Sequence, residues 1–172
     1  MRPVGWLLGA GKHSSLRKSL DIISSMAVTP PALLTGRRGG LVLLVQSALD
    51  PTLSEWDGFL DVTTRAMADH GGTCRVIVFT DGGRPDSEMR EKSLDRGWRD
   101  NPNSPVVVIT DQALARGVIT VFSWFGLNIR GFAPDKLEQA FARVGLTGAE
   151  RSWVLAERAA LETQLVGVAS PR

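Results

Sequence analysis

Three uninterrupted apolar runs dominate the middle of the chain. They cover residues 41–45, 76–79 and 106–109 and consist mainly of valine, leucine and isoleucine. Apolar runs of this length without alternation are typical of strands that are buried on both faces of a parallel sheet. A weaker run at 32–35 precedes a glycine pair at 39–40, which is suited to a turn. We therefore expect a hairpin at the start of the sheet.

Segments with helical spacing separate these runs. The clearest begins at Thr52-Leu53-Ser54-Glu55, which has the spacing of a capping box, and ends at Gly71-Gly72. A second capping box, Thr147-Gly148-Ala149-Glu150, opens the final helix. Further helices are predicted over residues 86–98, 112–125 and 134–144, and a short strand over 129–132. Strands that alternate with helices indicate an α/β protein with a small, mainly parallel sheet and an N-terminal hairpin, with helices packed against the sheet.

The first 30 residues differ in composition from the rest of the chain. No acidic residue precedes Asp21, serines are frequent, and a Pro-Pro pair at 30–31 marks a boundary. We expect residues 1–30 to form a loosely ordered N-terminal extension. Residues 31–172 are predicted to form one domain, because a chain of 172 residues is too short for two comfortable ones.

Composition narrows the classes of function. Hydrophobic residues make up 43% and charged residues 22% of the chain, values typical of a globular protein. The net charge of +2 is too small to argue for nucleic-acid binding, and no apolar stretch is long enough to span a membrane. Cys74 is the only cysteine, which excludes an intramolecular disulfide and a multi-cysteine zinc site. A reducing, cytoplasmic location fits this cysteine usage best.

Several segments resemble a known family. They are Ser54-Glu55-Trp56 at a helix start, residues 76–83, and the stretch 110–117, which leads into an apolar helix. In these features and in element order over residues 41–165, the chain resembles the SpoIIAA-like branch of the STAS domains, the fold of bacterial anti-sigma-factor antagonists. The resemblance implies a non-enzymatic regulatory or binding domain that needs no cofactor.

Antagonists of this type carry a phosphorylatable serine in an Asp-Ser-Ser-Gly-like segment. The matching segment here is Asp86-Ser87-Glu88-Met89, which lacks the glycine. If Ser87 were phosphorylated at the start of a helix, the added charge would meet the positive end of the helix dipole and could block a partner at this edge. The alternative, which we favour, is that Asp86 or Ser87 is simply the N-cap of the helix.

Asp81 and Asp111 are the strongest candidates for metal chemistry. Each follows a predicted parallel strand, and ligands favour that edge of an open α/β sheet. If the two strands are neighbours, both carboxylates could hold Mg²⁺ in a metal-assisted enzyme. We favour the simpler interpretation, in which Asp81 belongs to a turn and Asp111 caps the next helix. The sequence gives no evidence that His13, His70 or Cys74 belongs to a catalytic pair of a nucleophile and a base.

The predicted helix over 112–125 is apolar on nearly every side. Its thin polar stripe includes Arg116 and Thr120, and its apolar surface includes Phe122 and Trp124. Burial within the domain explains such a helix best, while a subunit interface, as in a homodimer, or an apolar ligand pocket would explain it too. The leading hypothesis is a non-catalytic module that binds a protein partner or an apolar small molecule.

Overall fold

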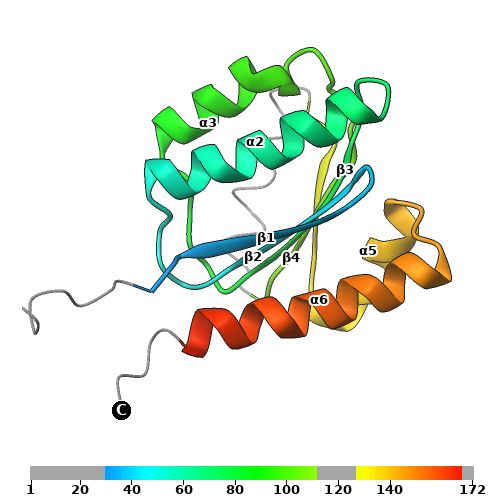
Figure 1. Ribbon diagram of the computed structural model, residues 1–172. Helices are drawn as coiled ribbons and strands as arrows, with labels where there is room; N and C mark the ends of the chain where they lie inside the picture. Colours follow the sequence, from blue (N-terminus) through cyan, green and yellow to red (C-terminus); the bar gives the residue numbers. More distant parts are fainter. Residues whose placement is uncertain (1–29, 112–126, 168–172) are drawn as a thin grey trace, which may run out of the picture.

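The chain forms a five-stranded mixed sheet, which confirms the predicted α/β fold. The computed structural model describes residues 30–111 and 127–167, and the strand order in the sheet is β1-β2-β3-β4-β5 (Figure 1). The first two strands form the expected antiparallel hairpin, and the remaining neighbours pair in parallel. The strands are β1 (Leu33–Arg38), β2 (Leu41–Gln46), β3 (Arg75–Thr80), β4 (Val106–Ile109) and β5 (Ile129–Phe132).

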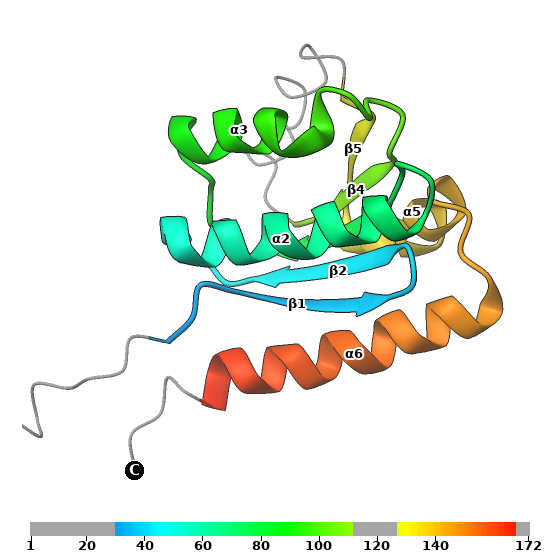
Figure 2. The same cartoon turned by 45° about the horizontal axis from the view of Figure 1, so that its top comes forward.

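Helices cover both faces of this sheet. On one face lie α2 (Leu53–Asp69) and α3 (Ser87–Ser93), and on the other lie α5 (Leu137–Arg143) and α6 (Gly148–Gly167) (Figures 1 and 2). The β2-α2-β3 and β3-α3-β4 connections step across the sheet in the same direction. Right-handed crossovers therefore place both helices on the same face.

Alternating strand residues supply two separate cores. On β2, Val42 and Leu44 pack beneath α2, while Leu41 and Leu43 pack against the α5 and α6 side. All four are almost completely buried. This double burial is the reason that the strand reads as a continuous apolar run in the sequence.

Three predicted elements have different bounds in the structure. Strand β1 extends to Arg38 rather than ending at residue 35, because its pairing with β2 continues to the turn. The helix predicted over 86–98 is interrupted: α3 is followed by a wider turn, η1 (Leu94–Trp98), in which Gly97 has a φ of 104°. The helix predicted over 134–144 begins with a short 3₁₀ turn, η2 (Pro134–Lys136), before α5.

Two predicted segments lie outside the described residues. One is the N-terminal extension, apart from Pro30, and the other is the apolar helix predicted between β4 and β5. The candidate residues Arg116, Thr120, Phe122 and Trp124 belong to the second segment. Among the helices that the structure does describe, none is both long and apolar enough to cross a membrane.

A charged cluster fixes the start of α6 against the sheet. Glu150 completes the predicted second capping box, because its carboxylate accepts a hydrogen bond from the Thr147 amide at 2.9 Å. The same carboxylate forms a two-pronged ion pair with the guanidinium of Arg75 on β3. The hydrogen bonds from Arg75, followed by those from Thr147, lower the pKa of Glu150 to about 2.

This lowered pKa predicts a loss of stability in acid. The folded carboxylate stays ionised while the unfolded one, with a pKa near 4.5, takes up a proton. The contribution of Glu150 is therefore complete above about pH 4.5 and declines as the pH falls towards 2. Urea unfolding measures the free energy of unfolding between pH 7 and pH 2.5. As the pH falls, this free energy should decline more steeply for the parent chain than for Glu150→Gln, which should already be less stable at pH 7. The matched variant Glu138→Gln, at a side chain that is 75% exposed, should follow the parent curve. Parallel curves for the parent chain and Glu150→Gln would contradict this assignment.

Candidate functional site

The structure brings Asp81 and Asp111 to the same edge of the sheet. Strands β3 and β4 are neighbours in register, and both aspartates are exposed and line one hollow of about 500 Å³ beside α6. In the described part of the chain, no group of three histidine, cysteine, aspartate or glutamate side chains is placed to hold a metal ion. The described residues therefore offer no further protein ligand placed to complete a metal site on these two carboxylates.

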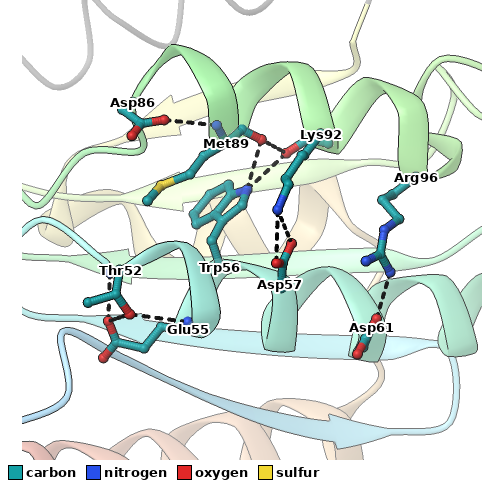
Figure 3. Close-up of polar contacts among 10 residues, drawn as sticks. Thr52, Glu55, Trp56, Asp57, Asp61, Asp86, Met89, Lys92 and Arg96 are labelled. Atoms are coloured by element: carbon teal, nitrogen blue, oxygen red, sulfur yellow. Dashed lines mark hydrogen bonds and ion pairs between the residues drawn. The ribbon is translucent and has the colours of Figure 1, made fainter.

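Ser87 is the first residue of α3, and it is not the residue that caps the helix. The cap is Asp86, whose carboxylate accepts a hydrogen bond from the Met89 amide at 2.8 Å (Figure 3). The capping interpretation is therefore confirmed for Asp86. Ser87 is exposed, and its proposed role as a switch stays a prediction.

An apolar cavity that no local sequence pattern predicts lies on the α2 and α3 face of the sheet. Its volume is about 290 Å³. The sheet forms its floor, and residues of α2, α3 and η1 contribute to its walls. The lining is mainly apolar, with a few polar groups. The described residues that line it are Leu44, Gln46, Trp56, Phe59, Val76, Val78, Thr80, Gly83, Arg84, Pro85, Arg90, Ser93, Trp98, Val106, Val108, Leu127 and Ile129.

Trp56 links the two helices beside this cavity. Its indole Nε1 donates to the Met89 carbonyl oxygen at 3.0 Å and to Ser93 Oγ at 3.1 Å, so the side chain of an α2 residue is anchored on α3 (Figure 3). Its ring also meets that of Phe59, with centroids 5.1 Å apart. A buried tryptophan requires such a partner for its N–H, and here that partner fixes the separation of the two helices.

Two ion pairs continue the contact between α2 and the α3–η1 segment. Lys92 Nζ lies 2.9 Å from an Asp57 carboxylate oxygen, and Arg96 Nη1 lies 2.7 Å from one of Asp61 (Figure 3). Both pairs are partly exposed, so each contributes little to stability by itself. Together with Trp56 they set the register of the two helices, and hence the shape of the cavity wall.

Several polar groups of the lining lie near the C-terminal ends of the strands, while Arg90 and Ser93 come from α3. Gln46 and Thr80 are register partners at the ends of β2 and β3, and the segment after β3 supplies Gly83 and Arg84. Gln46 is only 4% exposed, and its Nε2 has no hydrogen-bond partner among the described residues. The cavity therefore has an apolar body and a polar end, at the edge where open α/β sheets bind ligands.

The single cysteine takes no part in this site. Cys74 is buried, and its burial raises the pKa of the thiol to about 11. At neutral pH it remains a protonated thiol, which is a poor nucleophile and a poor metal ligand.

The sequence contained weak signals for the cavity. Gln46 is a polar residue at the end of an otherwise apolar strand, and Trp56 and Trp98 are large side chains on the helices that follow β2 and β3. Neither observation predicts a hollow, because the same pattern would also fit a filled core.

No protein-family model matches the chain, and searches of curated proteins and of solved structures found no significant match. The resemblance to STAS domains therefore remains a prediction from the residues quoted above.

Proposed function

We propose that this protein is a non-enzymatic binding module that takes up an apolar small molecule in the cavity beside Trp56. The observation that carries the proposal is the cavity itself, whose lining is mainly apolar with a few polar groups at one end. Small-molecule sites commonly have this composition, in which apolar walls supply affinity and polar groups supply orientation. A regulatory module is also the class that the STAS resemblance implies.

The volume of the cavity indicates the size of the ligand. An apolar cavity of ~150 Å³ is large enough to take up benzene. The cavity here is about 290 Å³, roughly twice that volume. A two-ring aromatic compound or a short aliphatic chain therefore suits it.

The described surface favours a small molecule over a protein partner. Its exposed large apolar side chains are Leu49 and Leu53, just before and at the start of α2, and Leu155 and Val166, which lie eleven positions apart on α6. Single exposed apolar residues are normal on a monomer and do not form a docking surface by themselves. The alternative of a metal-assisted enzyme that uses Asp81 and Asp111 has less support, because no group of three histidine, cysteine, aspartate or glutamate side chains among the described residues is placed to hold a metal ion.

Naphthalene, a neutral two-ring hydrocarbon, tests the proposal directly. In a titration of ¹⁵N-labelled protein, the indole N–H signals of Trp56 and Trp98 should shift in a saturable way, because both rings line the cavity. The Trp153 signal should stay in place, since that residue packs against the core on the opposite face.

A variant that fills the cavity provides the control. Val78→Phe places a ring among the lining residues and should abolish the shifts, whereas Val166→Phe, at a site that is 68% exposed, should leave them unchanged. Absence of saturable shifts in the parent chain, or shifts that persist in Val78→Phe, would rule out this cavity as the binding site.

A further inference from the structure

Gln46 is a lining residue at the polar end of the cavity, and its side-chain amide has a hydrogen-bond donor without a partner among the described residues. The residue is only 4% exposed. A buried donor without a partner is costly, so native structures usually pair such groups with protein, water or a ligand. A ligand with an acceptor oxygen would satisfy this donor.

The position of the amide places that acceptor beside Gly83. A Cβ atom built on Gly83 would lie 2.7 Å from Gln46 Nε2, so the amide and this lining glycine are in close proximity. The next residue along the chain is Arg84, whose amide donates to an Asp50 carboxylate oxygen at 2.8 Å. This hydrogen bond from the Arg84 amide holds the start of the segment after β3 beside the polar end of the cavity.

The charged groups of the lining have one sign. Arg84 and Arg90 are its charged members, and none of the described lining residues is acidic. Arg90 Nη1 donates to the Pro85 carbonyl oxygen at 3.1 Å, which directs the guanidinium towards the segment that follows β3. Neither arginine forms an ion pair with a carboxylate in the described ranges. In the described lining, two arginines without an ion-pair partner and the lack of an acidic side chain favour an anionic group on the ligand.

We propose that the cavity binds an apolar carboxylate, whose oxygens accept a hydrogen bond from Gln46 Nε2 and face Arg84 and Arg90, while its hydrocarbon part lies between Trp56, Trp98 and the sheet. This inference rests on the proposed function and names the chemical class of the ligand. The strand direction agrees with it. From Val76 through Val78 to Thr80, and from Leu44 to Gln46, the lining changes from apolar to polar towards the C-terminal edge.

Three matched probes separate the contributions of the apolar body, the acceptor and the charge. They are naphthalene, methyl 2-naphthoate and 2-naphthoate, each titrated by following the Trp56 and Trp98 indole signals. We expect 2-naphthoate to bind at least tenfold more tightly than naphthalene, with the ester between them, because hydrogen bonds to charged acceptors are the stronger ones. Added salt should weaken binding of 2-naphthoate and leave binding of the ester unchanged.

Two variants assign these effects to residues. Gln46→Leu should weaken binding of 2-naphthoate about tenfold, and that of the ester several-fold, relative to binding of naphthalene by the same variant. A far-ultraviolet circular dichroism spectrum like that of the parent chain shows that the variant is folded. The double variant Arg84→Gln/Arg90→Gln should weaken binding of 2-naphthoate by about three- to tenfold relative to binding of naphthalene by the same variant, and should remove the salt dependence of 2-naphthoate binding. Gln164→Leu, at an exposed position on α6, is the matched control and should change nothing.

The outcomes separate the two proposals. If none of the three probes binds, the proposed function is wrong and the inference falls with it. If naphthalene binds at Trp56 and Trp98 but 2-naphthoate binds no more tightly, the proposed function stands and the carboxylate assignment is wrong. The assignment is also wrong if the preference for 2-naphthoate survives in both Gln46→Leu and the double arginine variant.

Discussion

Replacement of Trp56 by alanine is expected to destabilise the fold by about 3–5 kcal/mol, the range for removal of a large aromatic side chain from a core. The side chain is 9% exposed, and its removal would take away the ring contact with Phe59. It would also take away the indole donor that ties α2 to Met89 and Ser93 on α3. Urea denaturation of the variant and the parent chain, followed by far-ultraviolet circular dichroism, measures the difference.

Two further variants separate packing from hydrogen bonding at Trp56. Trp56→Phe keeps most of the ring and removes the donor, so its cost should be only about 1 kcal/mol. Trp153→Ala removes a tryptophan side chain from a partly buried site on α6. It should lower the free energy of unfolding clearly less than Trp56→Ala does. Equal losses for the two alanine variants would show that Trp56 has no special place in joining the helices.

The sheet could be predicted because its strands are buried on both faces. Continuous apolar runs identified β2, β3 and β4, and the glycine pair located the hairpin. The capping box at the start of α2 was also readable, because it depends on residues only three positions apart. The structure adds a long-range contact that no local pattern contains: Glu55 Oε1 accepts from the Ala32 amide at 2.7 Å, so the same carboxylate also holds the start of the hairpin.

The end of the helix after β3 was less predictable for a physical reason. Apolar Leu94 and Trp98 continue a helical spacing, so the sequence favoured one helix to residue 98. Gly97 adopts a φ of 104°, which glycine reaches without steric cost, and the helix gives way to a wider turn. In this arrangement Trp98 is 5% exposed and lines the cavity, and Leu94 packs against the same core.

The site itself could be predicted only in fragments. Sequence reasoning placed Asp81 and Asp111 at the ends of two parallel strands, and the pairing of β3 with β4 shows that these strands are neighbours. It did not find the cavity, because a hollow depends on the separation of α2 and α3 from the sheet. Contacts between residues more than thirty positions apart, such as Trp56 with Met89, set that separation. The role of Gln46 could not be predicted, because only the structure shows that its Nε2 is buried and has no hydrogen-bond partner among the described residues.

Among the positions beside the cavity, Gly83 is the one where an added methyl group should lower the stability of the protein most. Its Cβ would lie 2.1 Å from the Leu49 carbonyl oxygen and 2.9 Å from that of Ser47, both of which are backbone atoms. The Gly83 amide already donates to the Ser47 oxygen at 3.1 Å, so the two segments are held together and cannot simply separate. We expect Gly83→Ala to cost about 1–3 kcal/mol, the range for overpacking of a tight site.

The same substitution at Gly58 is the matched control. Gly58 lies within α2, is exposed, and has no heavy atom within 4 Å of an added Cβ. Alanine there should therefore stabilise the protein by about 0.5–1 kcal/mol, because glycine is the poorer helix former. Gly83→Ala should in addition weaken binding of 2-naphthoate more than binding of naphthalene, since the new methyl group would displace the Gln46 amide and not the aromatic walls. A gain of stability in both variants would show that the segment after β3 does not approach β2 as closely as described. Equal losses of affinity for naphthalene and 2-naphthoate would instead show that Gly83 does not act on the polar end of the cavity.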